Sequence, residues 1–327
     1  MKLLLLIIFS IIGLILALVG VHYAIKFFSI RKLQGTGLSY EEIDEQSSAK
    51  ASKYDFIVQH IGYYSILVVT CLSTLFPFVW MILTSLKTVS EAQDIVNLHF
   101  FPASPQWHNY ADVFEKLDLL TGLKNTMIIE VGTIPIMLFI SALVAYGFEK
   151  MRLKHKTFWL LFIMSGLMIP YASVLLPQYR MYGYLFDDEP WLWPFILPTW
   201  FGNVSVVFFF IQYMKGVPSE LFEASRIDGC GYFKSFLLIM LPNMVLAIMC
   251  QAVFSFVGNW NDFFGPSIYL SDPENKTLQV LLYSFASGSD KPLLYAGSFI
   301  TCIPLFAIYL AFQRFFVGSM AISGIKG

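Results

Sequence analysis

The chain has 327 residues, of which 57% are hydrophobic and 13% are charged, and its formal net charge is -1 at pH 7. Soluble domains contain about 25% charged residues, so this composition indicates a protein that lies mostly in lipid. The nearly balanced charge also excludes the basic excess that is typical of a nucleic-acid-binding protein.

Seven apolar stretches are long enough to cross a membrane. The hydrocarbon core of a bilayer is about 30 Å thick and requires about 20 mainly apolar residues per helix, because backbone polar groups in lipid must be satisfied within the helix. In chain order, the predicted spans are residues 3–28, 61–84, 123–148, 157–182, 192–214, 241–258 and 295–318. The expected fold class is therefore an all-α integral membrane protein.

The first span, residues 3–28, could instead be a secretory signal peptide. Its apolar run from Leu3 to Val21 is longer than the hydrophobic region of a usual signal peptide, and no cleavage site of small residues follows closely. We therefore interpret it as a membrane anchor. The polar stretch 35–56 that follows is expected to be a linker.

Lys and Arg in short loops predict the orientation, because they favour the cytoplasmic side. The loop between the third and fourth spans contains Lys150, Arg152, Lys154 and Lys156, so it is expected inside. By alternation, the other inside segments are the linker 35–56, the segment 215–240 and the C-terminal tail. The segments expected outside are the N-terminus and the loops 85–122, 183–191 and 259–294.

The segment between the fifth and sixth spans, residues 216–241, is predicted to fold as a helix, a turn and a second helix. Pro218 fits the first turn of a helix, and Glu220 and Glu223 would favour the positive end of its dipole. Gly229 suits a left-handed residue that ends the helix. The segment is therefore expected to form a short hairpin at the cytoplasmic face.

The second helix of this hairpin is predicted from about Tyr232 to Leu241, and Pro242 then indicates a kink or the entry into the next span. On the first helix, residues at helical spacing share one face that a partner could approach closely: Leu221, Ala224, Ser225 and Asp228. An amphipathic hairpin of this kind suits docking to another protein. A surface or re-entrant helix without a partner explains the pattern equally well.

The hairpin sequence resembles the EAA loop of bacterial ABC importer permeases. The similarity is carried by Glu223-Ala224-Ser225-x-x-Asp228-Gly229, followed after nine residues by Ile239-x-Leu241-Pro242. Ser225 stands where the usual pattern has a second alanine, and Leu246 stands where many members have another proline. Serine is nearly isosteric with alanine, and the proline difference concerns only the entry to the next span.

Other short motifs narrow the resemblance to the carbohydrate-uptake type, similar to the smaller membrane subunit of the maltose transporter. They cover about residues 60–327 and occur in the expected order: Asn109-Tyr110, Asn125-Thr126, Ala145-Tyr146-Gly147-Phe148, Ile169-Pro170, Trp260-Asn261-Asp262-Phe263, Thr277-Leu278 and Gly324-Ile325-Lys326-Gly327. The resemblance implies a transmembrane domain of six core helices at 60–327, with the coupling hairpin at 216–241. Residues 1–59 depart from that pattern and are expected to form an extra N-terminal helix and its linker.

The resemblance also implies partners and roles. It implies a second related permease, two ATP-binding subunits and an extracellular solute-binding protein, assembled in the bacterial cytoplasmic membrane to import a sugar or oligosaccharide. The residues implied in coupling to the ATPase are Glu220, Glu223, Ala224, Ser225, Arg226, Asp228 and Gly229. The chain contains no Gly-x-x-x-x-Gly-Lys-Ser/Thr phosphate loop, so ATP and Mg are expected on the partner ATPase and this chain is expected to be a transport subunit rather than an enzyme.

Polar residues in and beside the spans are candidates for a substrate path, because buried polar groups in membrane helices usually face the protein interior or water. These candidates are Asn203, Gln251, Trp260, Asn261 and Asp262. Hydrogen bonds between helices explain the amides equally well, and a tryptophan at the end of a span is also normal for the membrane interface.

The outer loop 271–292 matches in position the loop that members of the resembled family insert into the binding protein. Its candidate contact residues are Ser287, Gly288 and Ser289. An ordinary polar connection is the alternative interpretation.

Three alternatives to a sugar importer are a permease of the same superfamily for a non-sugar solute, a secondary transporter and a membrane-embedded enzyme. A secondary transporter should show inverted repeats and ion-binding residues at the midplane. An enzyme should place paired acids, histidines or cysteines at matching depths. The four cysteines and five histidines are dispersed without the spacing of a metal site, so no metal is expected.

Overall fold

A computed structural model describes most of the chain: Ala24, Phe27, Phe28, Arg31 and residues 40–94, 97, 99–186, 191–286, 288 and 290–324. Every regular element in these residues is a helix, which confirms the all-α class for the described part of the chain. The chain forms two compact units, Met1–Leu83 and Thr84–Gly327.

The first unit contains most of α2 (Tyr40–Ser85), a helix of 46 residues. Its part from Tyr63 to Ser85 is long and apolar enough to cross a membrane, as predicted for 61–84. Large side chains such as Leu72 are well exposed along this part, as expected for a helix that faces lipid or another protein.

The structure describes only part of the N-terminal region for which a span and a linker are predicted. The described part of the predicted linker, residues 40–56, is helical and continuous with the span that follows. The predicted first span, residues 3–28, lies outside the described residues apart from Ala24, Phe27 and Phe28, so its crossing of the membrane stays a prediction.

The second unit contains the remaining helices. In chain order they are α3 (Val89–Gln93), α4 (Asn109–Lys116), α5 (Leu119–Lys150), α6 (Lys156–Ser165), η1 (Gly166–Met168), α7 (Tyr171–Leu185), α8 (Trp193–Ile196), η2 (Leu197–Phe201), α9 (Val204–Met214), α10 (Glu220–Ile227), α11 (Tyr232–Ser235), η3 (Phe236–Met240), α12 (Leu241–Asn243), α13 (Val245–Trp260), α14 (Phe264–Tyr269), η4 (Pro273–Asn275), α15 (Leu278–Ala286) and α16 (Lys291–Gly324). Of the short elements, η1, η2 and η4 are 3-10 helices and η3 is a π-helix.

Three stretches of the second unit are continuous candidate spans: Leu119–Lys150, Trp193–Met214 and Lys291–Gln313. They agree with the predictions at 123–148, 192–214 and 295–318. The first and last are single long helices, which apolar composition favours because each helix satisfies its own backbone polar groups.

Two other predicted spans are broken rather than continuous. Lys156–Met168 and Tyr171–Leu185 meet at 87°, and Tyr232–Asn243 and Val245–Tyr269 meet at 74°. At the first break, Pro170 is extended and lacks the N–H that a continuing helix would use. With each bent pair counted as one span or none, the described residues contain four to six candidate spans.

Helix α5 is central to the second unit and packs against α9, α13, α15 and η2. Near its C-terminal half, a hydrophobic core joins it to α9 and to the hairpin helices through Tyr146, Phe210 and Phe236. Another core, around Leu278 and Trp260, joins the start of α5 at Leu119 to α4, α13, α15 and α16. The long helix α5 therefore links two separate cores.

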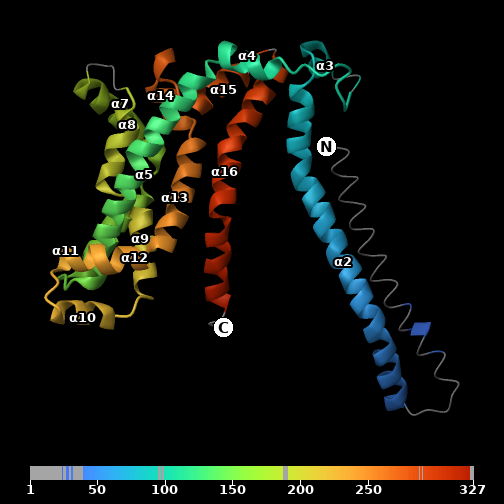
Figure 1. The fold of residues 1–327 in the computed structure, drawn as a ribbon, viewed down its shortest axis with the longest axis horizontal. Helices are drawn as coiled ribbons and strands as arrows, with labels where there is room; N and C mark the ends of the chain where they lie inside the picture. The colour runs from blue at the N-terminus through green and yellow to red at the C-terminus, as the bar shows by residue number, and fades with distance from the viewer. Residues whose placement is uncertain are drawn as a thin grey trace. The chain divides into compact units, whose positions relative to one another are not determined.

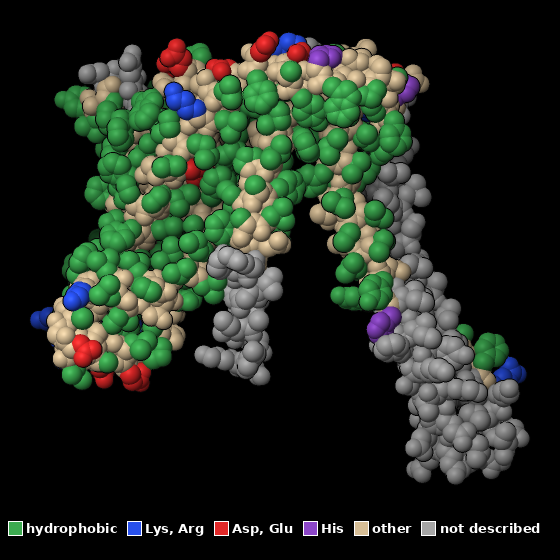
Figure 2. All heavy atoms as spheres, in the orientation of Figure 1, with side chains coloured by type: hydrophobic (Ala, Val, Ile, Leu, Met, Phe, Trp, Pro, Cys, Tyr) green, Lys and Arg blue, Asp and Glu red, His purple; other side chains and the backbone are tan. Residues whose placement is uncertain are grey.

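The second unit has two distinct ends (Figure 1). The segments α10, α11 and α12 lie at one end, here called the hairpin end, and α4, α14 and α15 lie at the other, here called the loop end. Within this unit, charged side chains gather at both ends, and hydrophobic side chains cover the surface between them (Figure 2). This distribution fits a bundle that crosses a bilayer with both ends in water.

Candidate functional site

The first hairpin helix, α10, forms where the sequence predicts it. It begins after Ser219, two residues later than the expected start at Pro218. Glu220 and Glu223 lie in its first turn, where negative charge favours the positive end of the helix dipole.

Gly229 ends this helix in the predicted left-handed conformation, with φ of 78°. The N–H of Cys230 donates to the carbonyl of Ser225 at 2.9 Å, and the N–H of Gly229 donates to the carbonyl of Arg226 at 3.1 Å. These two bonds form a Schellman motif, which satisfies carbonyls that a helix end would otherwise leave free. The turn of the hairpin is therefore well defined.

The two hairpin helices are joined through serine side chains. The hydroxyl of Ser225 lies 3.0 Å from that of Ser235 and donates to the carbonyl of Phe222 at 2.8 Å. Ser225 is only 5% exposed. The expectation that it shares an exposed face with Ala224 is therefore wrong, because its small side chain faces inward and allows close approach of the second helix.

The hairpin is anchored on the C-terminal end of α5. The Tyr146 ring lies 5.3 Å from the Phe236 ring and 6.1 Å from the Phe222 ring. The Lys150 ammonium donates to the carbonyl of Val217 at 3.2 Å and sits 4.9 Å from the centre of the Phe222 ring. Buried aromatic contacts and a cation over a ring both resist separation of the hairpin from α5.

The opposite face of α10 is open. The exposed residues of this face and its turn are Glu220, Leu221, Glu223, Ala224, Arg226, Ile227, Asp228 and Gly229. Ile227 is 87% exposed beside these charges. Leu221 is also 44% exposed, so this face carries two apolar side chains beside charged groups, and a protein partner could cover them.

A pocket of about 240 Å³ lies between the hairpin and the end of α5. Its lining residues are Tyr146, Glu149, Lys150, Ser219, Phe222, Glu223, Arg226, Tyr232 and Ser235. On its wall, the Arg226 guanidinium sits 4.9 Å from the Tyr232 ring centre, and the Glu149 carboxylate accepts from the Lys156 ammonium at 3.0 Å. Arg226 therefore lies between the pocket and the exposed face, where it can contact a docked protein.

We expect Gly229→Val to loosen the hairpin turn more than Gly229→Asn. A Cβ at this position would meet no atom within 4 Å, so the effect comes from the positive φ alone. L-residues pay about 1–2 kcal/mol there, and Asn least among them. Hydrogen exchange of the hairpin measures the difference. Gly231→Val is the matched control, because Gly231 has φ of -71° and open space around it. Equal exchange in all three variants would contradict the expectation.

Trp260, predicted as a possible substrate contact, is a core residue. It is 1% exposed, and its indole N–H donates to the carbonyl of Thr301 at 3.1 Å. The Phe256 ring stacks on it at 5.2 Å, and the Gln279 amide donates to its carbonyl at 3.1 Å. In this structure its side chain joins α13 to α16 and does not face a path.

Two other path candidates make local hydrogen bonds. The Asn203 side chain caps α9 by accepting from the N–H groups of Ser205 and Val206 at 2.9 and 3.3 Å. The exposed Asn261 amide donates to the carbonyl of Val257 at 2.8 Å, one turn back on α13. Both contacts are structural in character.

The remaining path candidates are half-buried on or after α13. Gln251 lies in the middle of this helix. Asp262 follows it, and its carboxylate accepts from the N–H of Gly265 at 3.4 Å. The structure thus places Asn203 at the start of α9 and the other four candidates on α13 or directly after it.

A buried polar cluster between α5 and α13 was not fully expected from the sequence. Glu130 is 3% exposed, and one of its carboxylate oxygens accepts from the Asn259 amide at 3.1 Å. The same amide lies 3.1 Å from the hydroxyl of Thr133. A carboxyl group in a span is visible in the sequence, but its pairing with Asn259 depends on how the two helices pack.

At the loop end, the outer-loop candidates are only partly described. Gly288 is exposed, and Ser287 and Ser289 lie outside the described residues. The segment from Glu274 to Leu278 lies earlier in the same loop. Asn125 and Thr126 of α5 hydrogen-bond this segment. The motifs Asn125-Thr126 and Thr277-Leu278, far apart in sequence, therefore meet at one place.

Lys87, which follows α2, is a buried charged residue that hydrogen-bonds a distant backbone carbonyl. Its ammonium donates to the carbonyl of His99, and the side chain is 3% exposed. Burial lowers the pKa of Lys87, and the nearby Glu91 carboxylate partly opposes this. Within the described residues, no group of three or more His, Cys, Asp or Glu side chains could hold a metal ion.

The fold defines the class of protein. A solved chain described as a "bacterial ABC transporter involved in the import of the acidic polysaccharide alginate" superposes with a TM-score of 0.67 and 20% sequence identity. The match covers 80% of this chain and 97% of that chain. The described helices therefore share the fold of a chain of this transporter.

Sequence comparison defines the family. Residues 119–320 match the family described as "Binding-protein-dependent transport system inner membrane component", and this chain belongs to it. The arabinooligosaccharides transport system permease protein AraQ of Halalkalibacterium halodurans is 30% identical over 77% of this chain and 91% of its own length. AraQ of Bacillus subtilis is 30% identical over 83% and 98%, and the lactose permease protein LacG of Rhizobium radiobacter is 27% identical over 79% and 93%. Members of this family are membrane channel subunits rather than enzymes, and the ATPase is a separate subunit.

Proposed function

We propose that this chain is one of two permease subunits of an ATP-driven importer that moves a sugar or oligosaccharide into the cytoplasm. The relatives described as arabinooligosaccharide and lactose permeases support a carbohydrate substrate. The observation that carries the proposal is the hairpin of residues 216–241, which is closed by Gly229, anchored on α5 and exposed on its charged face.

The proposed arrangement has six core helices in residues 60–327 and one further helix in residues 1–59, seven in all. The hairpin end and the C-terminus lie in the cytoplasm, and the loop end and the N-terminus lie outside. Lys150, Arg152 and Lys154 near the hairpin support this orientation, because basic residues favour the cytoplasmic side. The partners are a second permease, two ATP-binding subunits and an extracellular solute-binding protein.

The hairpin transmits the movement of the ATPase. Its exposed face fits a groove of the ATPase subunit, with Glu223, Arg226 and Asp228 as contact groups and Gly229 as the stop that orients them. The partner ATPase binds ATP with Mg, and its closure displaces the hairpin. Because Phe222 packs on Tyr146, this displacement also moves α5.

The substrate path is proposed along α13, past Gln251 and toward Asn261 and Asp262. These residues are half-buried or exposed, so a second permease packed against this helix could share them around a solute. Trp260 and Asn203 support the path by fixing the ends of α13 and α9.

Co-purification tests the assembly. The tagged chain, extracted from its native membrane in mild detergent, is expected to retain a second permease and an ATPase, identified by mass spectrometry. Recovery of the chain alone, under conditions in which a known importer of this type stays assembled, would reject the proposal.

Charge reversal tests the hairpin's role. Glu223→Lys is expected to lower solute uptake by about tenfold or more, equivalent to about 1.4 kcal/mol of docking free energy, while the complex still inserts in the membrane. Glu223 is exposed, so the change leaves the core of the hairpin intact. Glu115→Lys is the matched control, because Glu115 is an exposed acid at the loop end. Normal uptake by Glu223→Lys would reject the assigned role.

A further inference from the structure

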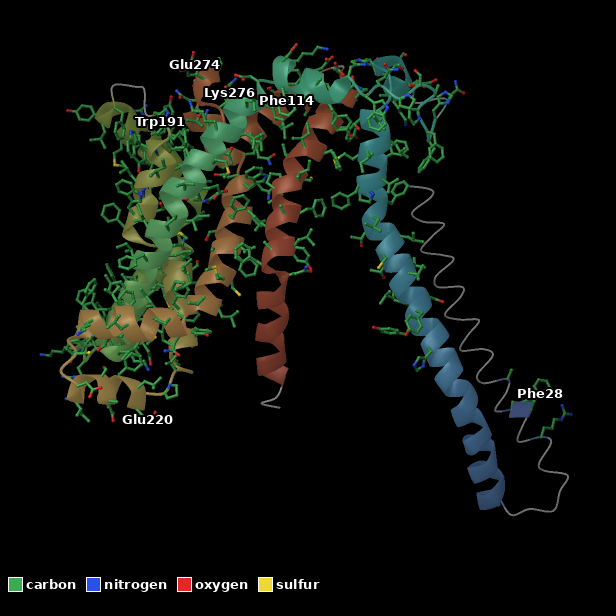
Figure 3. The ribbon with its side chains drawn as sticks, in the orientation of Figure 1. Phe28, Phe114, Trp191, Glu220, Glu274 and Lys276 are labelled. Carbon is green, nitrogen blue, oxygen red and sulfur yellow. The ribbon has the colours of Figure 1, made fainter. Side chains whose placement is uncertain are left out.

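Two neighbouring side chains near the start of α5 hold a distant segment of the loop end. The Asn125 amide donates to the carbonyls of Glu274 and Lys276 at 2.8 and 3.0 Å, although these residues are 149 and 151 positions further along the chain. The hydroxyl of Thr126 accepts from the N–H of Leu278 at 3.0 Å. Figure 3 shows Glu274 and Lys276 beside this end of α5.

The contact is buried and closely packed. Asn125 is 4% exposed and Thr126 is 3% exposed. One turn earlier, a Cβ added to Gly122 would lie 2.7 Å from a Leu281 side-chain carbon and 3.0 Å from the Leu278 Cα, so any larger residue there would require Leu281 and the Leu278 backbone to shift. Because buried hydrogen bonds are costly to leave unmade, the segment is firmly attached to α5.

The held segment presents a rigid turn to solvent. Asp272, Pro273 and Glu274 are exposed, and η4 shapes the chain through Pro273–Asn275. The Asp272 carboxylate accepts from the N–H of Glu274 at 3.1 Å and from the Asn275 amide at 3.2 Å. A polar turn that is already ordered loses little entropy when a partner binds it.

The other end of α5 holds the hairpin. Tyr146 packs on Phe222 and Phe236, and Lys150 hydrogen-bonds the carbonyl of Val217. Asn125 and Tyr146 are 21 residues apart within one helix. At 1.5 Å per residue, this separation is about 30 Å along the helix axis. That distance equals the thickness of the hydrocarbon core.

The helix between these contacts is unbroken. It runs through 32 residues from Leu119 to Lys150, whereas the bent pairs around Pro170 and Met244 change direction by 87° and 74°. The other long helix of this unit, α16, packs on α3, α4, α13 and α15. Pro135 lies inside α5 and removes one of its backbone hydrogen bonds, but the helix continues through it from Leu119 to Lys150. A helix without a sharp bend can therefore carry a displacement from one of these contacts to the other.

We propose that Asn125 and Thr126 are positioning residues that couple an outer docking surface, Asp272–Leu278, to the hairpin through α5. The inference rests on the proposed function, in which the loop end is outside. The partner that this surface fits is the extracellular solute-binding protein, whose docking displaces the turn and, with it, the helix that carries the hairpin.

The test uses the whole complex in lipid nanodiscs, with the solute-binding protein recovered alongside it. Two readouts are measured as that protein is titrated: the rate of ATP hydrolysis, and hydrogen exchange of residues 216–241. In the wild type, both are expected to change on docking. In Asn125→Ala and Thr126→Val, the maximal stimulation of hydrolysis and the exchange change of the hairpin should each fall by about fivefold or more, the lower limit of common coupling between sites.

Conservative variants separate coupling from loosening of the loop. Thr126→Ser keeps the hydroxyl acceptor and is expected to restore the wild-type response. Thr121→Val and Asn97→Ala are matched controls, because Thr121 is on α5 away from the contact made by Asn125 and Thr126, and the Asn97 amide donates to the nearby Asp94 carboxylate at 3.2 Å. A weaker half-saturation with unchanged maximal stimulation in Asn125→Ala and Thr126→Val would show a purely local role and overturn the inference.

The two proposals fail differently. If no ATPase or binding protein associates with the wild-type complex, the proposed function itself is wrong. If both associate and hydrolysis is stimulated, but Asn125→Ala and Thr126→Val respond as the wild type does, only the coupling through α5 is rejected.

Discussion

Trp260→Ala is expected to destabilise the second unit by about 3–5 kcal/mol, the usual cost of removing a large buried aromatic side chain. The indole is 1% exposed, stacks on Phe256 and donates to the carbonyl of Thr301. Its removal leaves a cavity between α13 and α16 and an unsatisfied carbonyl. The midpoint of thermal unfolding of the purified chain in detergent measures the loss.

Two variants interpret the result. Trp260→Phe keeps an aromatic ring against Phe256 but removes the N–H donor, so it should cost about 1–3 kcal/mol. Trp107→Ala is the matched control, because Trp107 is 69% exposed and its truncation should change stability little. If Trp260→Ala left the unfolding midpoint unchanged but abolished uptake, the residue would be a substrate contact and the core assignment would be wrong.

Phe222→Ala is expected to loosen the first hairpin helix, α10, on α5 and to reduce solute uptake by at least about tenfold. Phe222 is 8% exposed and contacts both the Tyr146 ring and the Lys150 ammonium. Truncation of a buried phenylalanine costs about 3–5 kcal/mol, which would loosen α10 on α5 although Phe236 still packs on Tyr146. Uptake in proteoliposomes, compared with ATP hydrolysis in the same vesicles, measures the uncoupling.

The midpoint of thermal unfolding should change little, because Phe222 belongs to α10, which lies at the hairpin end of the unit. Phe201→Ala is the matched control, since Phe201 is 85% exposed and belongs to η2, before α9 and outside the hairpin. Uptake that remains coupled in Phe222→Ala would mean that α5 does not depend on this contact for its movement.

The hairpin shows why short-range signals were sufficient for one part of the site. A left-handed glycine, acids in a first turn and small residues at helical spacing act within one or two turns, so the sequence predicts them without knowledge of the fold. The structure confirms Gly229 as the stop. It differs at Ser225, because which face of a short helix turns inward depends on what packs beneath it.

The membrane spans likewise have features that the local sequence predicts and features that depend on packing. Apolar length predicted α2, α5 and α16 well, because a helix in lipid must satisfy its own backbone. A kink at Pro242 was one of two predicted alternatives, and the 74° bend follows directly after Asn243. The 87° bend beside Pro170 was not predicted, and neither angle was, since a proline marks a possible break but the neighbouring helices determine the angle.

By itself, the sequence determined that this protein is helical, lies in a membrane and carries an amphipathic hairpin, because composition, helix length and capping are local properties. Only the tertiary structure decided that Trp260 is buried, that Glu130 meets Asn259, and that Asn125 holds the carbonyls of Glu274 and Lys276. The physical reason is that hydrogen bonds and packing between residues 41 to 151 positions apart depend on where each helix comes to lie, and no local pattern in the chain records that position.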